Sequence, residues 1–187
     1  FTANDGKGTS TDTYTVNLTV NNSAEKDSMT VHVPDGLNPK FYVSSGYGTD
    51  GIEILGDGVT AEKGENGAYT LHYPKNAELL SVRTDTYGGM AFAAVKDSTI
   101  TLRCAELSVV DYENKPAEST NTVTYSGHTA KAGTNGWLLA VGGEYTFTAV
   151  PENTTDFKTA DKTVTLESGE DTYKMELMLG INNAITI

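Results

Sequence analysis

The sequence predicts an all-β protein built from antiparallel β-sandwich modules arranged in tandem. Short stretches in which apolar and polar residues alternate recur along the chain, as at 69–73 and 144–149, and this is the period of a strand with one buried face. Clusters of Gly, Asn, Asp and Pro separate these stretches. Thr, Tyr and Val are abundant, and helical periodicity appears over no useful length, so strands are expected throughout.

The clearest pair of strands is expected at residues 135–149. Gly142 and Gly143 separate an apolar stretch at 137–141 from the alternating stretch at 144–149. Because glycine adopts positive φ without steric cost, this sequence predicts a tight β-hairpin.

At the beginning of the chain, the sequence predicts the last part of one domain, followed by a linker. In residues 1–20, a turn at 4–8 precedes a strand in which Tyr14, Val16 and Leu18 alternate with polar residues. This resembles the closing strands of Ig-like or cadherin-like repeats in bacterial surface proteins, which implies that 1–20 is the terminal hairpin of a preceding Ig-like module. Residues 21–28 are short and polar, and we expect a linker there.

Two sandwich modules and a short tail are expected after the linker. Residues 29–106 carry the strands of a first module, at 29–33, 41–43, 52–55, 69–73, 79–82, 90–95 and 100–104. Residues 107–180 carry those of a second, at 107–111, 123–125, 137–141, 145–149, 164–166 and 173–179. Residues 181–187 are expected to begin a following strand or to form a tail.

The spacing of apolar residues indicates that the two modules repeat one architecture. The offset from Tyr69 to Tyr145 is close to the offset from Val31 to Val109. For strands that come later in each module, the offset between the two modules is smaller. This difference predicts an inserted loop in the first module between Tyr69 and Ile100.

The second module carries turn and strand motifs in a recognisable order. A turn at Asn114–Pro116 follows Asp111, and Thr134–Trp137 precedes the strand Gly143–Ala149. These motifs resemble the prealbumin-like sandwich of carboxypeptidase-regulatory-like and collagen-adhesin B-type repeats. The resemblance implies an antiparallel sandwich used as a stalk or spacer, so the whole chain is expected to be a tandem array of Ig-like and prealbumin-like sandwiches.

The same resemblance bears on covalent cross-linking. Many collagen-adhesin B-type repeats carry a Lys–Asn isopeptide bond whose formation uses a buried Glu, and the matching position here is Ala149. The resemblance therefore implies no isopeptide bond in this module, although Asn182 and Asn183 lie near its end.

Charge and composition exclude several classes of partner. The formal net charge of −12 and the pI of about 4.5 repel both a phosphate backbone and an anionic membrane surface. No apolar run is long enough to span a membrane, so we expect neither nucleic-acid binding nor membrane insertion by this segment.

The cysteine and histidine residues do not have the sequence spacing that is typical of a catalytic site or a zinc site. Cys104 is the single cysteine, and because it shares a strand face with Ile100 and Leu102, a buried thiol is expected. The three histidines lack metal-ligand spacing, and no Gly-x-Ser-x-Gly elbow is present. We therefore expect no enzyme activity and no required cofactor.

Calcium is the one metal for which the sequence offers candidate ligands. Asp50, Glu53 and Asp57 supply hard oxygen donors in neighbouring Gly-rich loops, as calcium requires. Asp-Gly turn chemistry is the alternative explanation of the same residues.

Aromatic residues are the candidate ligand-binding groups. Tyr47 and Tyr87 lie beside glycines in predicted loops, where burial is difficult, and Trp137 lies either in the hairpin core or at its rim. An exposed ring offers an apolar face on which a sugar can stack. The remaining tyrosines that alternate into strand faces are expected in the core: Tyr69, Tyr73, Tyr145 and Tyr173.

These features favour a non-catalytic spacer or adhesive stalk of a large secreted bacterial surface protein. Neighbouring modules of the same polypeptide would be its partners, with a cell-surface glycan or a host or matrix protein as a possible ligand. Two alternatives remain open: a carbohydrate-binding accessory module of a secreted glycoside hydrolase, and a fibre subunit that assembles by strand addition.

Overall fold

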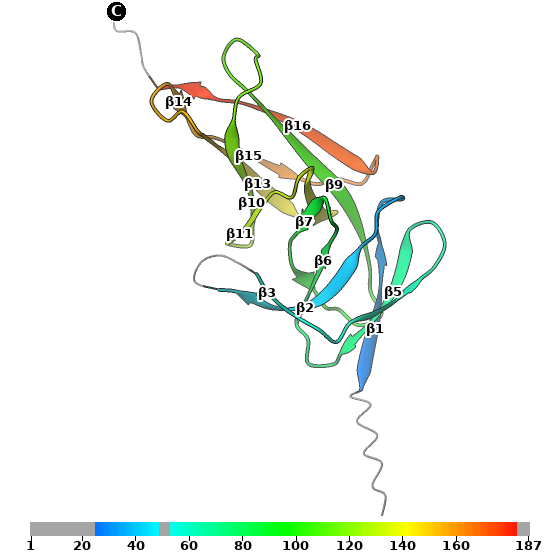
Figure 1. The fold of residues 1–187 in the computed structure, drawn as a ribbon. Helices are drawn as coiled ribbons and strands as arrows, with labels where there is room; N and C mark the ends of the chain where they lie inside the picture. The colour runs from blue at the N-terminus through cyan, green and yellow to red at the C-terminus, as the bar shows by residue number, and fades with distance from the viewer. Residues whose placement is uncertain (1–24, 49–52, 183–187) are drawn as a thin grey trace, which may run out of the picture.

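The computed structural model describes residues 25–48 and 53–182, and this part of the chain is all β (Figure 1). The prediction of an all-β, tandem-sandwich fold is confirmed. The hairpin expected at 1–20, the calcium candidate Asp50 and most of the tail expected at 181–187 lie outside the described residues. Within the described part, no helix is long and apolar enough to cross a membrane.

Seventeen strands make up the described fold. The first eight are β1 (Lys26–His32), β2 (Lys40–Tyr47), β3 (Glu53–Gly56), β4 (Thr60–Lys63), β5 (Ala68–Pro74), β6 (Leu79–Arg83), β7 (Tyr87–Gly89) and β8 (Phe92–Ala93). The long β9 (Thr99–Val110) is followed by β10 (Ser119–Tyr125), β11 (His128–Lys131), β12 (Gly136–Ala140) and β13 (Glu144–Pro151). The last are β14 (Phe157–Lys158), β15 (Ala160–Thr165), β16 (Thr172–Met178) and β17 (Gly180–Ile181).

Strand β9 is shared by both sandwiches, and it corrects the predicted module boundary. Its 12 residues run without a break through the boundary expected between residues 106 and 107. The start of β9 pairs in parallel with β1, and residues 104–110 pair in parallel with β16. Strand β12 pairs antiparallel with the opposite edge, at residues 102–105. The sequence predicts two strands here instead of one only because polar residues interrupt the apolar pattern near Glu106.

Two further sheets pack on opposite faces of the sheet that contains β9. The order β3-β2-β6-β8 forms one of them, and β11-β10-β13-β15 forms the other. The first sandwich lies between the former sheet and β4-β5-β1-β9, and the second lies between the latter sheet and β12-β9-β16. The described chain enters at β1, at one end of the molecule, and reaches β17 at the other (Figure 1).

Each sandwich has its own hydrophobic core. The first core contains Met29, Val31, Val33, Leu71, Tyr73, Leu80, Val82, Tyr87, Phe92, Leu102, Cys104 and Leu138. The second core contains Met90, Ala105, Val109, Val123, Trp137, Leu139, Tyr145, Phe147, Ala149, Leu166, Met175, Leu177 and Leu179. Successive side chains of a strand point to opposite faces, so β12 contributes Leu138 to the first core and Trp137 and Leu139 to the second.

The hairpin predicted at residues 135–149 is wrong, although both of its strands exist. Strand β12 pairs with β9 and β7, whereas β13 pairs with β10 and β15. Gly142, with a φ of 85°, therefore carries the chain from one sheet to the other. The apolar run in β12 is buried on both faces, which is the pattern of a strand between two layers rather than of a half-solvated hairpin.

The two sandwiches repeat one strand order, but not with all of the predicted equivalences. The outer sheets match strand for strand, and in each sandwich the first strand pairs in parallel with the last, β1 with β9 and β9 with β16. Val31 and Val109 lie in equivalent strands, β1 and β9. Tyr69 lies in β5, which matches β12, whereas Tyr145 lies in β13, which matches β6. Strand β4 has no counterpart among the described strands, so additional chain in the first sandwich precedes β5.

The sequence did not predict the polar start of β1 or three strands at sheet edges. Strand β1 begins at Lys26, inside the expected linker 21–28, because antiparallel backbone pairing with β5 requires no apolar side chain. Strands β4 and β11 are exposed or nearly so, and β7 is rich in glycine. Strands β4, β7 and β11 do not carry the apolar–polar sequence alternation that marks a half-buried strand.

Burial of the Cys104 thiol, as predicted from its strand position, is confirmed. Its side chain lies in the first core beside Tyr87, and burial raises the pKa of the thiol. We expect a maleimide or iodoacetamide to modify Cys104 no faster than the protein unfolds, because the neutral buried thiol is a poor nucleophile. Intact-mass measurement over time, with and without urea, checks this. Rapid labelling of the native protein would contradict it.

Candidate functional site

A cavity lies at the junction of the two sandwiches. Its volume is about 690 Å³. It is bounded by the facing ends of β2 and β3, by the β6–β7 connection, and by the β10–β11 hairpin with the residues that follow it. Its lining residues are Tyr47, Glu53, Arg83, Thr84, Asp85, Thr86, Tyr87, Gly88, Gly89, Thr122, Thr129, Ala130, Lys131, Ala132 and Gly133. Three residues predicted separately as site candidates, Tyr47, Tyr87 and Glu53, thus come to one place.

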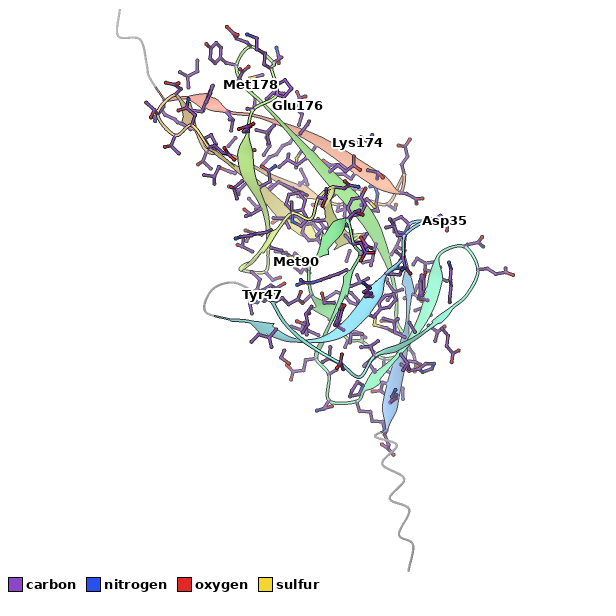
Figure 2. All side chains as sticks on the ribbon, in the orientation of Figure 1. Asp35, Tyr47, Met90, Lys174, Glu176 and Met178 are labelled. Carbon is purple, nitrogen blue, oxygen red and sulfur yellow. The ribbon has the colours of Figure 1, made fainter. Side chains whose placement is uncertain are left out.

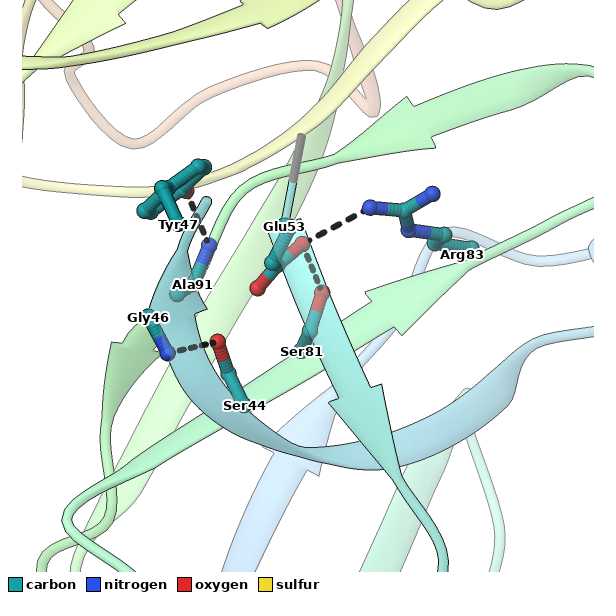
Figure 3. Close-up of polar contacts among 7 residues, drawn as sticks. All are labelled: Ser44, Gly46, Tyr47, Glu53, Ser81, Arg83 and Ala91. Atoms are coloured by element: carbon teal, nitrogen blue, oxygen red, sulfur yellow. Dashed lines mark hydrogen bonds and ion pairs between the residues drawn. The ribbon is translucent and has the colours of Figure 1, made fainter. Parts of the chain in front are cut away.

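A buried ion pair forms part of the cavity wall (Figure 3). Glu53 Oε2 accepts hydrogen bonds from Arg83 Nη2 at 2.9 Å and from Ser81 Oγ at 3.0 Å. The Glu53 side chain is only 2% exposed, whereas that of Arg83 is 38% exposed. Glu53 Oε1 and Arg83 Nε are buried and have no hydrogen-bond partner among the described residues.

The placement of Glu53 weighs against its predicted role as a calcium ligand. One of its oxygens is already occupied by Arg83 and Ser81, and a cation would compete with the guanidinium for the same carboxylate. Asp57 is exposed, and the described residues contain no group of three or more acidic, histidine or cysteine side chains placed to hold a metal ion. The Asp-Gly turn explanation fits Asp57 better.

Tyr47 connects the two sandwiches across the cavity. Its ring stacks on the imidazole of His128, with 4.4 Å between ring centroids and 12° between the ring planes. Its hydroxyl oxygen accepts a hydrogen bond from the backbone N–H of Ala91 at 3.3 Å. The side chain is half-buried, and in Figure 2 Tyr47 and Met90 lie where the two sandwiches meet.

Tyr87 and Trp137 do not present their rings to a ligand, which corrects two site predictions. Tyr87 is 8% exposed, and its hydroxyl donates a hydrogen bond to Glu106 at 2.8 Å. Trp137 has no exposed surface, and its indole N–H donates to the carbonyl of Ala130 at 3.2 Å. Both rings pack in the cores because the adjoining strands lie in the central sheet, so the described residues do not form the predicted three-ring platform.

Backbones of the two sandwiches approach closely beside the cavity. A Cβ on Gly133 would lie 2.6 Å from the amide nitrogen of Gly88 and 2.6 Å from the carbonyl oxygen of Thr86. Only glycine allows this approach between β7 and the segment that follows β11. No sequence pattern predicted this close approach, because glycine at that position is equally typical of a turn.

Replacing Gly133 by alanine is expected to lower the free energy of unfolding by about 1–3 kcal/mol, because backbone atoms must separate to admit the methyl group. Urea denaturation of the variant measures this. Gly56→Ala is the matched control, since its Cβ would meet nothing closer than 3.9 Å, and its change should stay within about 0.5 kcal/mol. Equal effects of the two substitutions would contradict a tight junction.

Arg103 is a buried charge that sequence reasoning missed. It is 8% exposed, and it donates hydrogen bonds to the carbonyls of Glu170, at 2.5 Å, and Glu167, at 2.6 Å. Its guanidinium lies 5.8 Å from the centre of the Tyr173 ring. These contacts fasten the β15–β16 connection to β9, so the role of Arg103 is structural. An arginine between Leu102 and Cys104 in an apolar stretch was the available signal.

Ala149 lies in the second core with no exposed surface, among apolar side chains of β9 and β16. The buried polar residues of the described part are Ser44, Glu53, Ser81 and Arg103. We therefore expect no isopeptide bond in the second sandwich. The intact mass of the purified protein should equal the mass calculated from its sequence. A mass lower by one ammonia, with a cross-linked Lys–Asn peptide after digestion, would contradict this expectation.

No family model matches the chain, and no curated protein matches it. Among solved structures, a mutant of the shaft pilin SpaA from Lactobacillus rhamnosus GG is 7% identical, with a TM-score of 0.31, over 86% of this chain and 100% of that one. A streptococcal ancillary pilin is 13% identical, with a TM-score of 0.29, over 83% of this chain and 69% of that one. The Bacillus anthracis TIE protein is 13% identical, with a TM-score of 0.30, over 82% of this chain and 34% of that one. Similarities this distant assign neither a family nor a function.

Proposed function

We propose that this chain is a rigid, force-transmitting spacer in a protein displayed outside the cell, on a bacterial surface. The observation that carries the proposal is the set of three parallel strands that connects the two ends of the described fold. Strand β1 pairs in parallel with β9, and β9 pairs in parallel with β16 (Figure 1). A pull on the start of β1 and the end of β16 therefore passes through both parallel pairs in series.

The direction of that pull favours mechanical resistance. The inter-strand hydrogen bonds of a parallel ladder run across the strands, so a force along the strands loads them together rather than one after another. The β9–β16 register extends over seven pairs, from Thr172 opposite Cys104 to Met178 opposite Val110. The polar edge strands of the described part that lie outside this path do not have to separate when force is transmitted from β1 to β16.

The junction between the sandwiches also favours a stiff spacer. Strands β9 and β12 bury side chains in both cores, and Met90, from the segment between β7 and β8, packs in the second core. Bending at the junction would expose these side chains to water, at a cost of about 25 cal/mol per Å² of apolar surface. A pair of sandwiches joined by a flexible linker has no such cost.

Four of the described sheet edges weigh against assembly by strand addition. Lysines lie on the edge strands β4, β11, β15 and β16, and charged edges discourage pairing with another chain. On β16, Lys174 and Glu176 are exposed and alternate with buried Met175 and Leu177 (Figure 2). Neighbouring modules of the same polypeptide are therefore the partners we favour over a second copy.

Single-molecule force spectroscopy tests the proposal through two pulling geometries. Handles at the two ends of the chain load β1–β9 and β9–β16 in shear. Handles at the N-terminal end and at a cysteine replacing Thr60 load the sheet from one end, because Lys26 Nζ lies 3.4 Å from Thr60 Oγ1 and both β1 and β4 pair with β5. We expect the second geometry to peel β4 and β5 away at a much lower force. Similar unfolding forces in the two geometries would refute a spacer built to carry tension.

A further inference from the structure

We propose that the cavity between the two sandwiches binds an uncharged, hydroxyl-rich ligand, a saccharide unit. The site is defined by Arg83, Thr86, Thr122 and Tyr47 around the buried carboxylate of Glu53. It is separate from the strand path that carries the spacer proposal, and it does not use the stacking platform that the buried Tyr87 and Trp137 rule out.

Two unpaired polar atoms in the wall point to a ligand. Glu53 Oε1 needs a hydrogen-bond donor, Arg83 Nε needs an acceptor, and neither atom has a partner in the part of the chain that the structure describes. Leaving a polar group buried and unpaired is costly, so such groups are normally matched by protein, water or ligand. Figure 3 shows that Glu53 Oε2, by contrast, is held by Ser81 and Arg83. Both unpaired atoms belong to the Glu53–Arg83 ion pair, and both of these residues line the cavity.

A hydroxyl group is the chemistry that satisfies both atoms. An O–H donates to a carboxylate oxygen and accepts from a guanidinium N–H, so neighbouring hydroxyls complete the pair without adding charge. The charged groups of the lining are balanced, with Glu53 and Asp85 against Arg83 and Lys131, and Asp85 also pairs with Lys40 at 3.1 Å. This balance favours a neutral ligand over an anion or a metal cation.

The rest of the lining suits a sugar in size and chemistry. Threonine hydroxyls come from both sandwiches, as with Thr86 and Thr122, and the Tyr47 ring supplies an apolar surface. The volume of about 690 Å³ lies within the range of small-molecule sites. Because the walls come from both sandwiches, an occupant would also add contacts across the junction.

NMR titration of the whole chain with glucose, galactose, mannose and N-acetylglucosamine, and with disaccharides of each, tests the site. At least one sugar should shift the backbone amides of residues 84–89 and 129–133 together. Thr122→Val, which removes one hydroxyl at nearly constant shape, should weaken that sugar's Kd about fivefold. Thr120→Val is the matched control on the same strand face, because Thr120 is exposed and outside the cavity lining, and it should leave Kd unchanged.

A second variant guards against loss of folding. Arg83→Lys keeps a positive charge beside Glu53 but removes Nε and the planar fork, so a folded protein with weakened sugar binding is expected. The proposal is overturned if no sugar shifts these amides, if the shifts lie elsewhere, or if Thr122→Val and Thr120→Val bind equally. A crystal soaked in the sugars that shows only an ordered water between Glu53 and Arg83 would also overturn it.

Discussion

Replacing Trp137 by alanine is expected to lower the free energy of unfolding by about 3–5 kcal/mol. The side chain has no exposed surface, and its ring packs edge-on against Phe147, with centroids 5.4 Å apart and planes at 74°. The substitution leaves a large cavity in the second core and an unpaired carbonyl at Ala130, which now accepts the indole N–H. Urea denaturation followed by circular dichroism measures the change, since the variant has lost its only tryptophan.

Trp137→Phe separates the two contributions. It keeps an aromatic ring against Phe147 but removes the indole N–H, so a smaller loss than that of Trp137→Ala is expected. If Trp137→Ala cost less than about 1 kcal/mol, the burial of β12 between two layers would be wrong.

Replacing Leu138 by alanine is expected to cost about 2–5 kcal/mol, through the other core. Leu138 is 1% exposed and packs in the first core, although it follows Trp137 directly in the chain and lies deep in the sequence of the second module. Chemical-shift changes in the variant should therefore concentrate in β1, β5 and β6, whereas those of Trp137→Ala should concentrate in β10 and β13.

Ile54→Ala is the control for Leu138→Ala. Ile54 is 52% exposed, so its truncation should change stability by no more than about 0.5 kcal/mol. Shift changes for Leu138→Ala confined to the second sandwich would contradict its place in the first core.

Local patterns predicted the strands that have a buried face of alternating apolar residues, because alternation reports directly which face of a strand is buried. The pairing of those strands was harder to predict, since it depends on contacts between distant segments. Two glycines after an apolar strand are as consistent with a crossing between sheets as with a hairpin, and the β12–β13 connection is a crossing. Three successive apolar residues, Trp137, Leu138 and Leu139, were the available sign of a strand buried on both faces.

The candidate site was predictable only in part. Tyr47 and Glu53 were selected because of their Gly-rich surroundings, and both line the cavity. Their partners were not selected, because Ser81 and Arg83 alternate with Leu80 and Val82 and read as the solvent face of an ordinary strand. The β10–β11 hairpin that closes the cavity comes from the other sandwich, and no short-range pattern connects it to Glu53.

Sharing of β9 and β12 makes the two sandwiches one folding unit, and urea unfolding observed in both at once tests this most directly. Trp137 fluorescence reports on the second core, and NMR amide signals of β2 and β6 report on the first sandwich. The shared strands predict coincident transitions with one midpoint and one slope, as a single cooperative unit requires. Two separate midpoints, with one sandwich remaining folded after the other has unfolded, would contradict the account.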